Sequence, residues 1–244
     1  KNGSGKTTIF KVISEIENIA SGEVTKRKSL SIGYMEQEIK DVSQNVKEYI
    51  LSGCGELFEL TKQMKLYEKK LENYSDDGLD KILEEYGMLQ TRYEHLGGYT
   101  LDEKFKRVCQ GIKIDPNFFE KNMSCLSGGE KVKMSLAKVL IQQPDLLLLD
   151  EPTNHIDLES IAWLEKFFRE YPGTIVIVSH DRYFLDNVIN RVIELEDKIT
   201  KDYIGNYSQY IQEKKEYVER QLVIYEAQQK KIKSMEEAIR RFRM

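Results

Sequence analysis

The sequence has few cysteines, little net charge and no long apolar segment, and each absence narrows the range of functions. Its three cysteines, Cys54, Cys109 and Cys125, are far apart and lack metal-ligand spacing, so we expect reduced thiols in a cytoplasmic protein. The net charge of -4 gives no bulk attraction to nucleic acids, although a local basic patch is compatible with it. The longest apolar runs, 146–149 and 175–178, are too short to span a bilayer, and the polar first residues are unlike a signal peptide.

A glycine-rich motif of the kind that binds phosphates stands at the start of the chain. Its last residues, Gly5-Lys6-Thr7, match the end of the pattern G-x-x-x-x-G-K-[ST]. The first glycine of that pattern and the preceding strand are not in the sequence, so we interpret the chain as a piece that lacks its natural N-terminus. We expect a helix over 6–17 to direct its positive end at the phosphates. A glycine turn before an ordinary helix is the alternative. The expected ATP-binding residues are Asn2, Gly3, Ser4, Gly5, Lys6, Thr7 and Thr8.

Two acidic residues, Asp150 and Glu151, follow the apolar run 146–149. Ligands of open parallel sheets bind at the carboxyl ends of the strands, so we expect Asp150 to hold Mg2+ together with the Thr7 hydroxyl. Glu151 is adjacent and can orient or deprotonate an attacking water. The alternative is a strand that ends in a solvated acidic turn. The specific order of the residues that follow, 152–157, argues against this alternative.

Three further polar residues are expected to contribute to the site. Gln37 follows a strand predicted over 29–34 and can complete the metal shell. His180 follows the apolar strand 174–178; such a histidine is usually structural, but the shared edge with Asp150 favours contact with a γ-phosphate or water. Asp157 is expected both to cap the helix that begins at Leu158 and to take part in the site. We assign no catalytic role to His95 or His155.

The segment Ser127-Gly128-Gly129-Glu130 is formally a capping box at the start of a helix. Its two glycines leave the helix amides bare, so a second anion can approach them. We therefore expect Ser127, Gly128, Gly129 and Glu130 to meet the γ-phosphate of a nucleotide that a different nucleotide-binding domain holds.

The remaining patterns are mainly helical. Apolar residues over 57–74 and 79–96 alternate spacings of three and four, which predicts an antiparallel hairpin with its tip at 75–78; a helical pair packed on the body is the alternative. Alternating strands and helices over 144–200 favour a parallel sheet. From Ser208 onward we predict one long helix with a net charge of +3 (nine Lys and Arg, six Glu). Its apolar stripe needs a partner, unless it is a peripheral terminal helix.

Taken in order, these motifs resemble those of the ATP-binding-cassette superfamily: a truncated Walker A, the Q-loop Gln37, a signature at 126–130, Walker B at 146–150, the D-loop Asp157 and the switch His180. The segments 151–157, 179–186 and 205–210 are similar in sequence to the corresponding motifs of the first cassette of ABC-F proteins. The resemblance implies an α/β P-loop NTPase cassette with an inserted helical hairpin and a long C-terminal helix. Its implied parts are a truncated ATP-binding core (1–55), the hairpin or arm (56–98), the signature, Walker B and switch part (99–206), and the start of an interdomain linker (207–244).

The same resemblance implies an ATPase that converts ATP and water to ADP and phosphate, with ATP and Mg2+ as cofactors and a second cassette in the full-length chain. It implies action on the ribosome through rRNA and tRNA, as a translation factor or in antibiotic-resistance ribosome protection. We expect a cytoplasmic location, no membrane span and no DNA partner. The isolated chain should hydrolyse ATP weakly. The alternatives are the energy subunit of a membrane transporter, which rarely continues into such a linker, and a DNA-repair ATPase, whose coiled coil is far longer.

Overall fold

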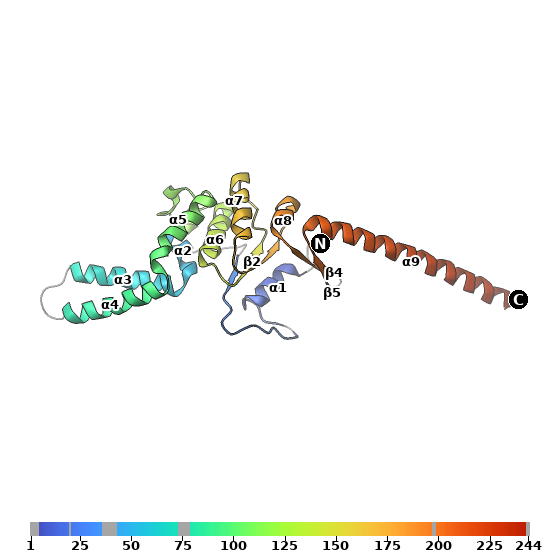
Figure 1. Cartoon of the computed structure of the whole chain (residues 1–244), viewed down its shortest axis with the longest axis horizontal. Coiled ribbons are helices and arrows are strands. Elements are labelled where there is room, and N and C mark those ends of the chain that lie inside the picture. Colours follow the sequence, from blue (N-terminus) through green and yellow to red (C-terminus); the bar gives the residue numbers. More distant parts are fainter. Residues whose placement is uncertain (1–4, 20, 36–42, 73–78, 197–198, 243–244) are drawn as a thin grey trace. The chain divides into compact units, whose positions relative to one another are not determined.

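The computed structural model describes residues 5–19, 21–35, 43–72, 79–196 and 199–242 (Figure 1). They divide into two compact units, Gly5–His180 and the residues from Asp181 onward, and each is described by itself. Within these residues no helix combines the length and the apolar character that crossing a membrane requires.

A parallel three-stranded sheet lies in the first unit, with the order β1 (Ile32–Tyr34), β2 (Leu146–Asp150) and β3 (Thr174–Val178). Ile32 pairs with Leu146, and Leu146 pairs with Thr174. Leu147, Leu148 and Leu149 are fully buried, as expected for an apolar central strand of a parallel sheet. The parallel sheet predicted for this part of the sequence is confirmed for β2 and β3, and both strands end at the same edge.

Helices surround this sheet in the first unit. They are α1 (Lys6–Ile13), α2 (Val46–Leu51), α5 (Leu101–Gly111), α6 (Gly128–Gln142) and α7 (Leu158–Arg169), with short 3-10 turns at Ser52–Cys54, Gly98–Thr100, Pro116–Phe118 and Met123–Cys125. Helix α6 packs against α2 and α5, and it places Leu136 and Leu140 in the core with no exposed surface. Helix α6, which begins directly after Ser127, is therefore anchored in the core through its buried face.

Helix α1 is shorter than the 6–17 predicted from the sequence. It ends at Ile13 because Glu15 adopts a left-handed conformation with φ 60°. The N–H of Ile16 then donates to Lys11 O at 2.8 Å and that of Glu15 to Val12 O at 3.1 Å. These two bonds form a Schellman ending, and a glutamate occupies the position where a glycine usually signals it.

The predicted hairpin is present as α3 (Glu56–Glu72) and α4 (Leu79–His95), which lie side by side (Figure 1). They are antiparallel, since Glu56 at the start of α3 pairs with Arg92 near the end of α4, whereas Tyr67, farther along α3, donates at 2.8 Å to Glu85, which comes earlier in α4. The predicted tip at 75–78 lies outside the described residues. The structure thus confirms the inserted helical hairpin.

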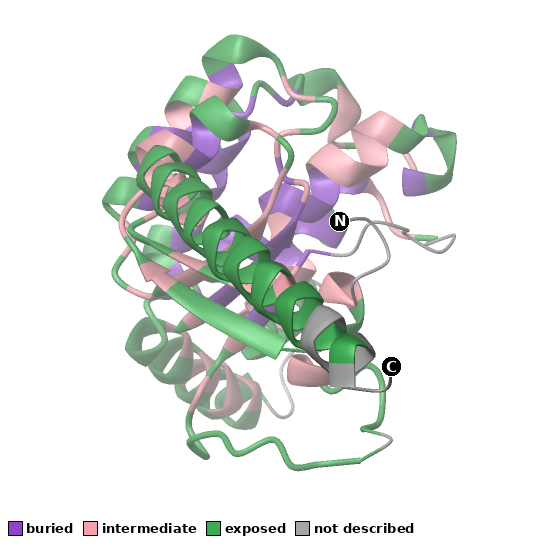
Figure 2. Cartoon of the chain, turned by 90° about the vertical axis from the view of Figure 1, so that its right-hand side faces the viewer, coloured by how far each residue is buried: buried purple, intermediate pink, exposed green. Residues whose placement is uncertain are grey.

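The second unit contains α8 (Arg182–Val188), β4 (Arg191–Glu196), β5 (Ile199–Ile204) and α9 (Tyr207–Phe242). The last strand that we predicted within 144–200 does not join the parallel sheet. It is β4, which pairs antiparallel with β5 from Arg191 with Ile204 to Glu196 with Ile199. The prediction was wrong here because strand β5, which follows after a short connection, provides a local antiparallel partner. The long helix is confirmed, and its described side chains are exposed along most of its length (Figure 2).

Candidate functional site

Thr7 and Asp150 lie in direct contact at the carboxyl end of β2. The Thr7 hydroxyl donates a hydrogen bond to Asp150 Oδ2 at 2.6 Å, although the two residues are 143 positions apart. Gly5 precedes α1 with φ 89°, a backbone conformation that residues other than glycine rarely adopt. Asp150 is 3% exposed. A hydroxyl and a carboxylate are oxygen ligands of the kind that Mg2+ prefers, so the chemistry of this pair fits the predicted metal.

Glu151 and His180 form the second contact of the site. The backbone N–H of His180 donates to Glu151 Oε2 at 3.2 Å, and His180 Nε2 lies 3.6 Å from Glu151 Oε1. The Glu151 side chain is 16% exposed, whereas that of His180 is 75% exposed. Glu151 has φ 54°, and its N–H donates to Val178 O at 2.7 Å. The turn after β2 therefore holds the carboxylate against the end of β3.

The Ser127 turn forms the capping box that the sequence predicts. Glu130 Oε2 accepts bonds from the Ser127 N–H at 2.7 Å and the Ser127 hydroxyl at 2.6 Å, while the Glu130 N–H donates to Ser127 Oγ at 3.4 Å. The Ser127 hydroxyl and N–H lower the pKa of Glu130. Ser127 and Gly128 are exposed, and Leu126 is buried. The buried side chain of Leu126 therefore anchors this turn, while the N-terminus of α6 faces solvent.

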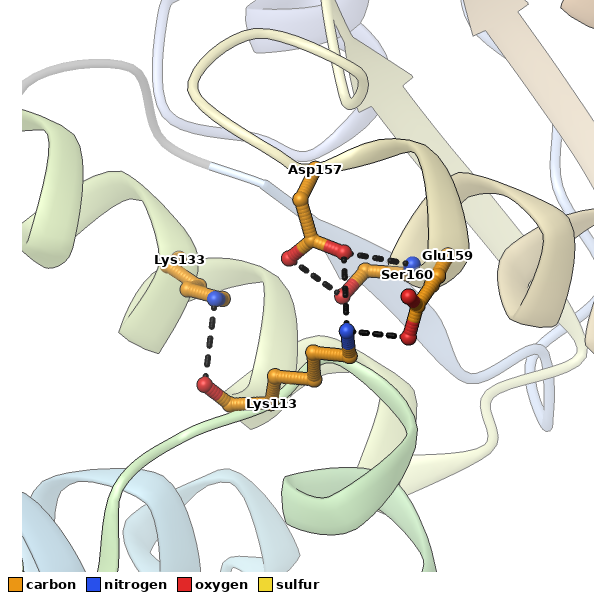
Figure 3. Close-up of polar contacts among 5 residues, drawn as sticks. All are labelled: Lys113, Lys133, Asp157, Glu159 and Ser160. Atoms are coloured by element: carbon orange, nitrogen blue, oxygen red, sulfur yellow. Dashed lines mark hydrogen bonds and ion pairs between the residues drawn. The ribbon is translucent and has the colours of Figure 1, made fainter.

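Asp157 caps α7 and belongs to a charged cluster (Figure 3). Its Oδ1 accepts the Ser160 N–H at 3.0 Å, and its Oδ2 accepts the Ser160 hydroxyl at 2.9 Å. Lys113 Nζ lies 3.6 Å from Asp157 Oδ1 and also pairs with Glu159. The Ser160 N–H and hydroxyl, together with the charges of Lys113 and Lys133, lower the pKa of Asp157 to about 2. Asp157 is thus an N-cap, as predicted, and remains ionised at neutral pH.

The structure brings some predicted site residues together and leaves others apart. Thr7 meets Asp150, and Glu151 meets His180. Among the described residues, no hydrogen bond or ion pair joins Ser127 to Thr7, Asp150 or Glu151. Gly5, Lys6 and Thr8 lie at the start of α1. Asn2, Gly3, Ser4 and Gln37 lie outside the described residues.

The sequence reasoning predicted the cap at Asp157 but missed its charged partner, Lys113. The spacing of Asp157 and Ser160 is typical of a helix cap and could have predicted their bonds. Lys113 precedes Glu159 by 46 residues, and no local pattern pairs them. His155, to which we assigned no catalytic role, lies against the Ser127 turn: a Cβ at Gly129 would be 3.1 Å from His155 Cγ.

Comparison with known proteins identifies the family. A family model described as "ABC transporter" matches residues 1–154, and a second model with the same description matches 193–244. The chain is 37% identical over 245 residues to "ABC transporter F family member 5" of Arabidopsis thaliana, covering 98% of this chain and 35% of that protein. It is 35% identical over 233 residues to "Energy-dependent translational throttle protein EttA" of Haemophilus influenzae, covering 95% of this chain and 41% of that protein. The chain therefore spans well under half the length of these relatives.

Solved structures show the same fold at lower identity. One is described as the ATP binding subunit of an ABC transporter; it has a TM-score of 0.57 and 14% identity and covers 84% of this chain and 75% of its own. Another contains an archaeal ribosome recycling factor, with a TM-score of 0.55 and 20% identity, and covers 86% of this chain and 34% of its own. The first family model covers more than half of the chain, and the F-family similarity extends over nearly all of it. The chain therefore belongs to the ATP-binding-cassette family and, within it, is a cassette of the ABC-F type.

Proposed function

We propose that this chain is the ATP-binding and ATP-hydrolysing cassette of an ABC-F protein that acts on the ribosome. The observation that carries the enzymatic part is the 2.6 Å hydrogen bond between Thr7 and Asp150, with Glu151 held beside it by His180. A metal-ligand pair and a carboxylate at one sheet edge are what phosphoryl transfer to water requires.

The start of α1 is the proposed phosphate site. Lys6 and the amides at the positive end of α1 bind the β- and γ-phosphates, with Asn2, Gly3, Ser4, Gly5 and Thr8 completing the ATP-binding set. Thr7, Asp150 and Gln37 are the proposed ligands of Mg2+. The bound metal would neutralise charge on the phosphates. These residues align the γ-phosphate with the carboxylate of Glu151.

Glu151 is the proposed general base, and it accepts a proton from the attacking water on its carboxylate. The carboxylate needs a fixed orientation for this step. The N–H of His180 at 3.2 Å holds one oxygen, and the imidazole lies 3.6 Å from the other. The exposed imidazole is free to contact the γ-phosphate, so His180 combines an orienting role with phosphate contact.

A second cassette completes the proposed active site. Ser127, Gly128, Gly129 and Glu130 form an open helix N-terminus, and Asp157 lies at the start of the next exposed turn. These groups would meet the nucleotide of the second cassette of the same full-length chain. The isolated chain lacks the reciprocal signature, which supports the expectation that it hydrolyses ATP weakly.

Two features favour a ribosomal role over the energy subunit of a transporter. The names of relatives at 35–37% identity refer to the F family and to a translational throttle. The hairpin α3–α4 and helix α9 also carry exposed lysines and arginines, which can bind phosphates of rRNA and tRNA. The finer proposal is a cytoplasmic translation factor or an antibiotic-resistance factor that protects the ribosome.

Cosedimentation tests the ribosomal role. The protein with both cassettes is incubated with purified ribosomes in ATP or in ADP and centrifuged through sucrose. We expect retention in ATP and release in ADP, because ATP closes the cassettes. A Glu120→Gln variant, changed at an exposed glutamate, is purified and sedimented in the same way. It controls for the effect of purification and of a single charge change on the amount of protein that sediments. Equal absence of ribosome binding in both nucleotides, with intact ATPase activity, would contradict the ribosomal role and favour the transporter alternative.

A further inference from the structure

The loop that ends at Asp157 is fastened to the chain segment that follows α5. Lys113 Nζ pairs with Glu159 and lies 3.6 Å from Asp157 Oδ1 (Figure 3). Lys113 itself has φ 52°, a backbone conformation that a non-glycine residue keeps only when its surroundings impose it. The backbone of Lys113 is therefore constrained, and its side chain reaches the two carboxylates from this position.

The same lysine is also joined to the helix that begins at the Ser127 turn. Lys133, on the second turn of α6, donates from Nζ to the backbone oxygen of Lys113 at 3.2 Å (Figure 3). Burial is the main cause that lowers the pKa of Lys133. Lys113 thus connects α6 through its carbonyl and the start of α7 through its ammonium group.

A second and independent contact joins the two elements closer to the Ser127 turn. The ring of His155 lies against Gly129, where an added Cβ would meet Cγ, Cβ and Nδ1 of His155 at 3.1, 3.2 and 3.4 Å. His155 has φ 62°, so its backbone is also constrained. A side chain at Gly129 would therefore press on the ring, and loss of the ring would remove this contact with the turn.

We propose that Lys113 and His155 are positioning residues that hold the Ser127 turn and the Asp157 loop as one unit, which approaches the nucleotide of the second cassette as a single surface. The inference rests on the composite active site proposed above. It assigns these two residues no contact with ATP. Their loss would leave the phosphate site around Thr7 and Asp150 intact, while the two elements that act on the other nucleotide would move independently.

The expected effect is modest because the ion pairs are exposed. Such pairs contribute little each, so we expect Lys113→Met to lower kcat for ATP about two- to fivefold. The affinity for ADP should stay unchanged, because ADP needs only the phosphate site of its own cassette. Lys113→Arg keeps the charge and should retain kcat within about twofold. His155→Ala should lower kcat similarly, whereas His155→Phe keeps a flat ring over Gly129 and should be less affected.

The experiment measures kcat, KM and ADP affinity in the protein with both cassettes. Lys106→Met, at an exposed lysine of α5, is the matched control. Ser127→Arg blocks the turn directly and tests the composite site itself. Because Ala and Phe have the same backbone requirement at residue 155, the difference between them reports the ring alone. Hydrogen exchange of the folded variants adds a readout without turnover: amides 128–131 and 160–161 should exchange faster together in Lys113→Met.

The outcomes separate this inference from the proposed function. A fall in kcat for Ser127→Arg, Lys113→Met and His155→Ala, with ADP affinity unchanged and Lys113→Arg active, supports both. A fall for Ser127→Arg alone, with unchanged exchange in Lys113→Met, leaves the composite site standing and overturns the inference. Full activity of Ser127→Arg removes the composite site, and the inference fails with it.

Discussion

Asp186 of α8 accepts two hydrogen bonds from Ser208 of α9. The backbone N–H of Ser208 donates to Oδ1 at 2.8 Å, and its hydroxyl donates to Oδ2 at 2.6 Å. The first amides of a helix lack partners within the helix, so Asp186 satisfies one of them from a different element. The Ser208 hydroxyl and N–H also lower the pKa of Asp186. The start of α9 is therefore fixed to α8.

A reciprocal pair strengthens the same helix start. The N–H of Gln209 donates to Asn206 Oδ1 at 3.0 Å, and the N–H of Asn206 donates to Gln209 Oε1 at 2.9 Å. This is the geometry of a capping box. Gly205 has φ 128°, a backbone conformation that other residues rarely adopt, which explains the glycine before the cap.

The first prediction concerns the attachment of α9. Ser208→Ala removes the hydroxyl bond to Asp186, and Asp186→Ala removes both bonds, so amide exchange over 207–211 should rise in that order. Ser234→Ala is the control, since Ser234 bonds only locally to the Lys231 carbonyl at 2.8 Å. Hydrogen exchange measured by mass spectrometry checks it. Unchanged exchange in Asp186→Ala would show that the Asn206 and Gln209 pair suffices.

The sequence predicted those features that depend on local patterns. Asp150 and His180 were placed at one edge because both follow apolar strands, and parallel strands end together. Ser127 and Glu130 were paired because their spacing defines a capping box. The site could be assembled to this extent because strand alternation and helix caps are encoded within a few neighbouring residues.

The features that were missed depend on contacts between distant residues, on backbone strain, or on the choice between two strand partners. Glu15 ends α1 in a left-handed conformation without a glycine or proline to announce it. Lys113 reaches Glu159 across 46 positions. Strand β4 pairs with the next strand, β5, and strand propensity alone does not choose between this local antiparallel partner and the parallel sheet. Propensity and periodicity carry none of this information.

The second prediction concerns catalysis. Glu151→Gln removes the carboxylate that accepts the proton but keeps the size of the side chain, so turnover should be abolished while ATP binding remains. Lys6, Thr7 and Asp150 are untouched. We expect the variant to stay closed with ATP and to remain on the ribosome. A phosphate-release assay with the protein carrying both cassettes checks this. Turnover near that of the unmodified protein would contradict the role of Glu151.

The third prediction concerns pH. The pKa of Asp157 is about 2 in the folded chain, against about 3.9 for an unperturbed aspartate. Because the folded value is depressed, the stabilisation is present above about pH 4 and is lost as the pH falls towards 2. Asp157→Asn keeps an N-cap acceptor but cannot titrate. The difference in unfolding free energy between the two proteins should therefore shrink between pH 4 and pH 2.

Urea unfolding at several pH values measures that difference, and NMR titration of the Asp157 carboxyl checks its pKa directly. Asp80→Asn, at an exposed aspartate of α4, is the control. If the Asp157 difference is constant over this range, the bonds from Ser160 do not depress the pKa.

The fourth prediction concerns the hairpin. Replacing residues 65–89 with a short Gly-Ser connection removes its outer part but keeps Phe58 and Leu60, which are 5% exposed and anchor its base. Nucleotide binding should be unchanged because no predicted phosphate ligand lies within the hairpin. Ribosome association should weaken, since the replacement removes exposed lysines such as Lys65 and Lys81. Unchanged cosedimentation and unchanged rescue of growth would reduce the hairpin to a structural insertion.

The last prediction concerns α9, whose apolar stripe and basic end call for two different neighbours. Val218, Leu222 and Tyr225 are 44, 55 and 58% exposed, too apolar a series to remain in water over a long helix. We expect the antiparallel second half of an interdomain linker to cover this stripe in the full-length chain. Lys230, Lys231 and Lys233 are exposed beside it and give the helix end a positive field despite the acidic chain.

Charge reversal of these three lysines to glutamate should weaken ribosome binding in the protein with both cassettes. If each lysine contacts one RNA phosphate, the slope of log K against log salt should become shallower by about 2 to 3. A triple reversal of Lys104, Lys106 and Arg107 to glutamate, at exposed positions of α5, makes the same change in total charge and is the control, and circular dichroism checks that the helix stays folded. An unchanged affinity and an unchanged salt slope in a folded triple variant would mean that α9 acts as a mechanical connection between cassettes, because a helix that bound RNA through these lysines could not tolerate their reversal.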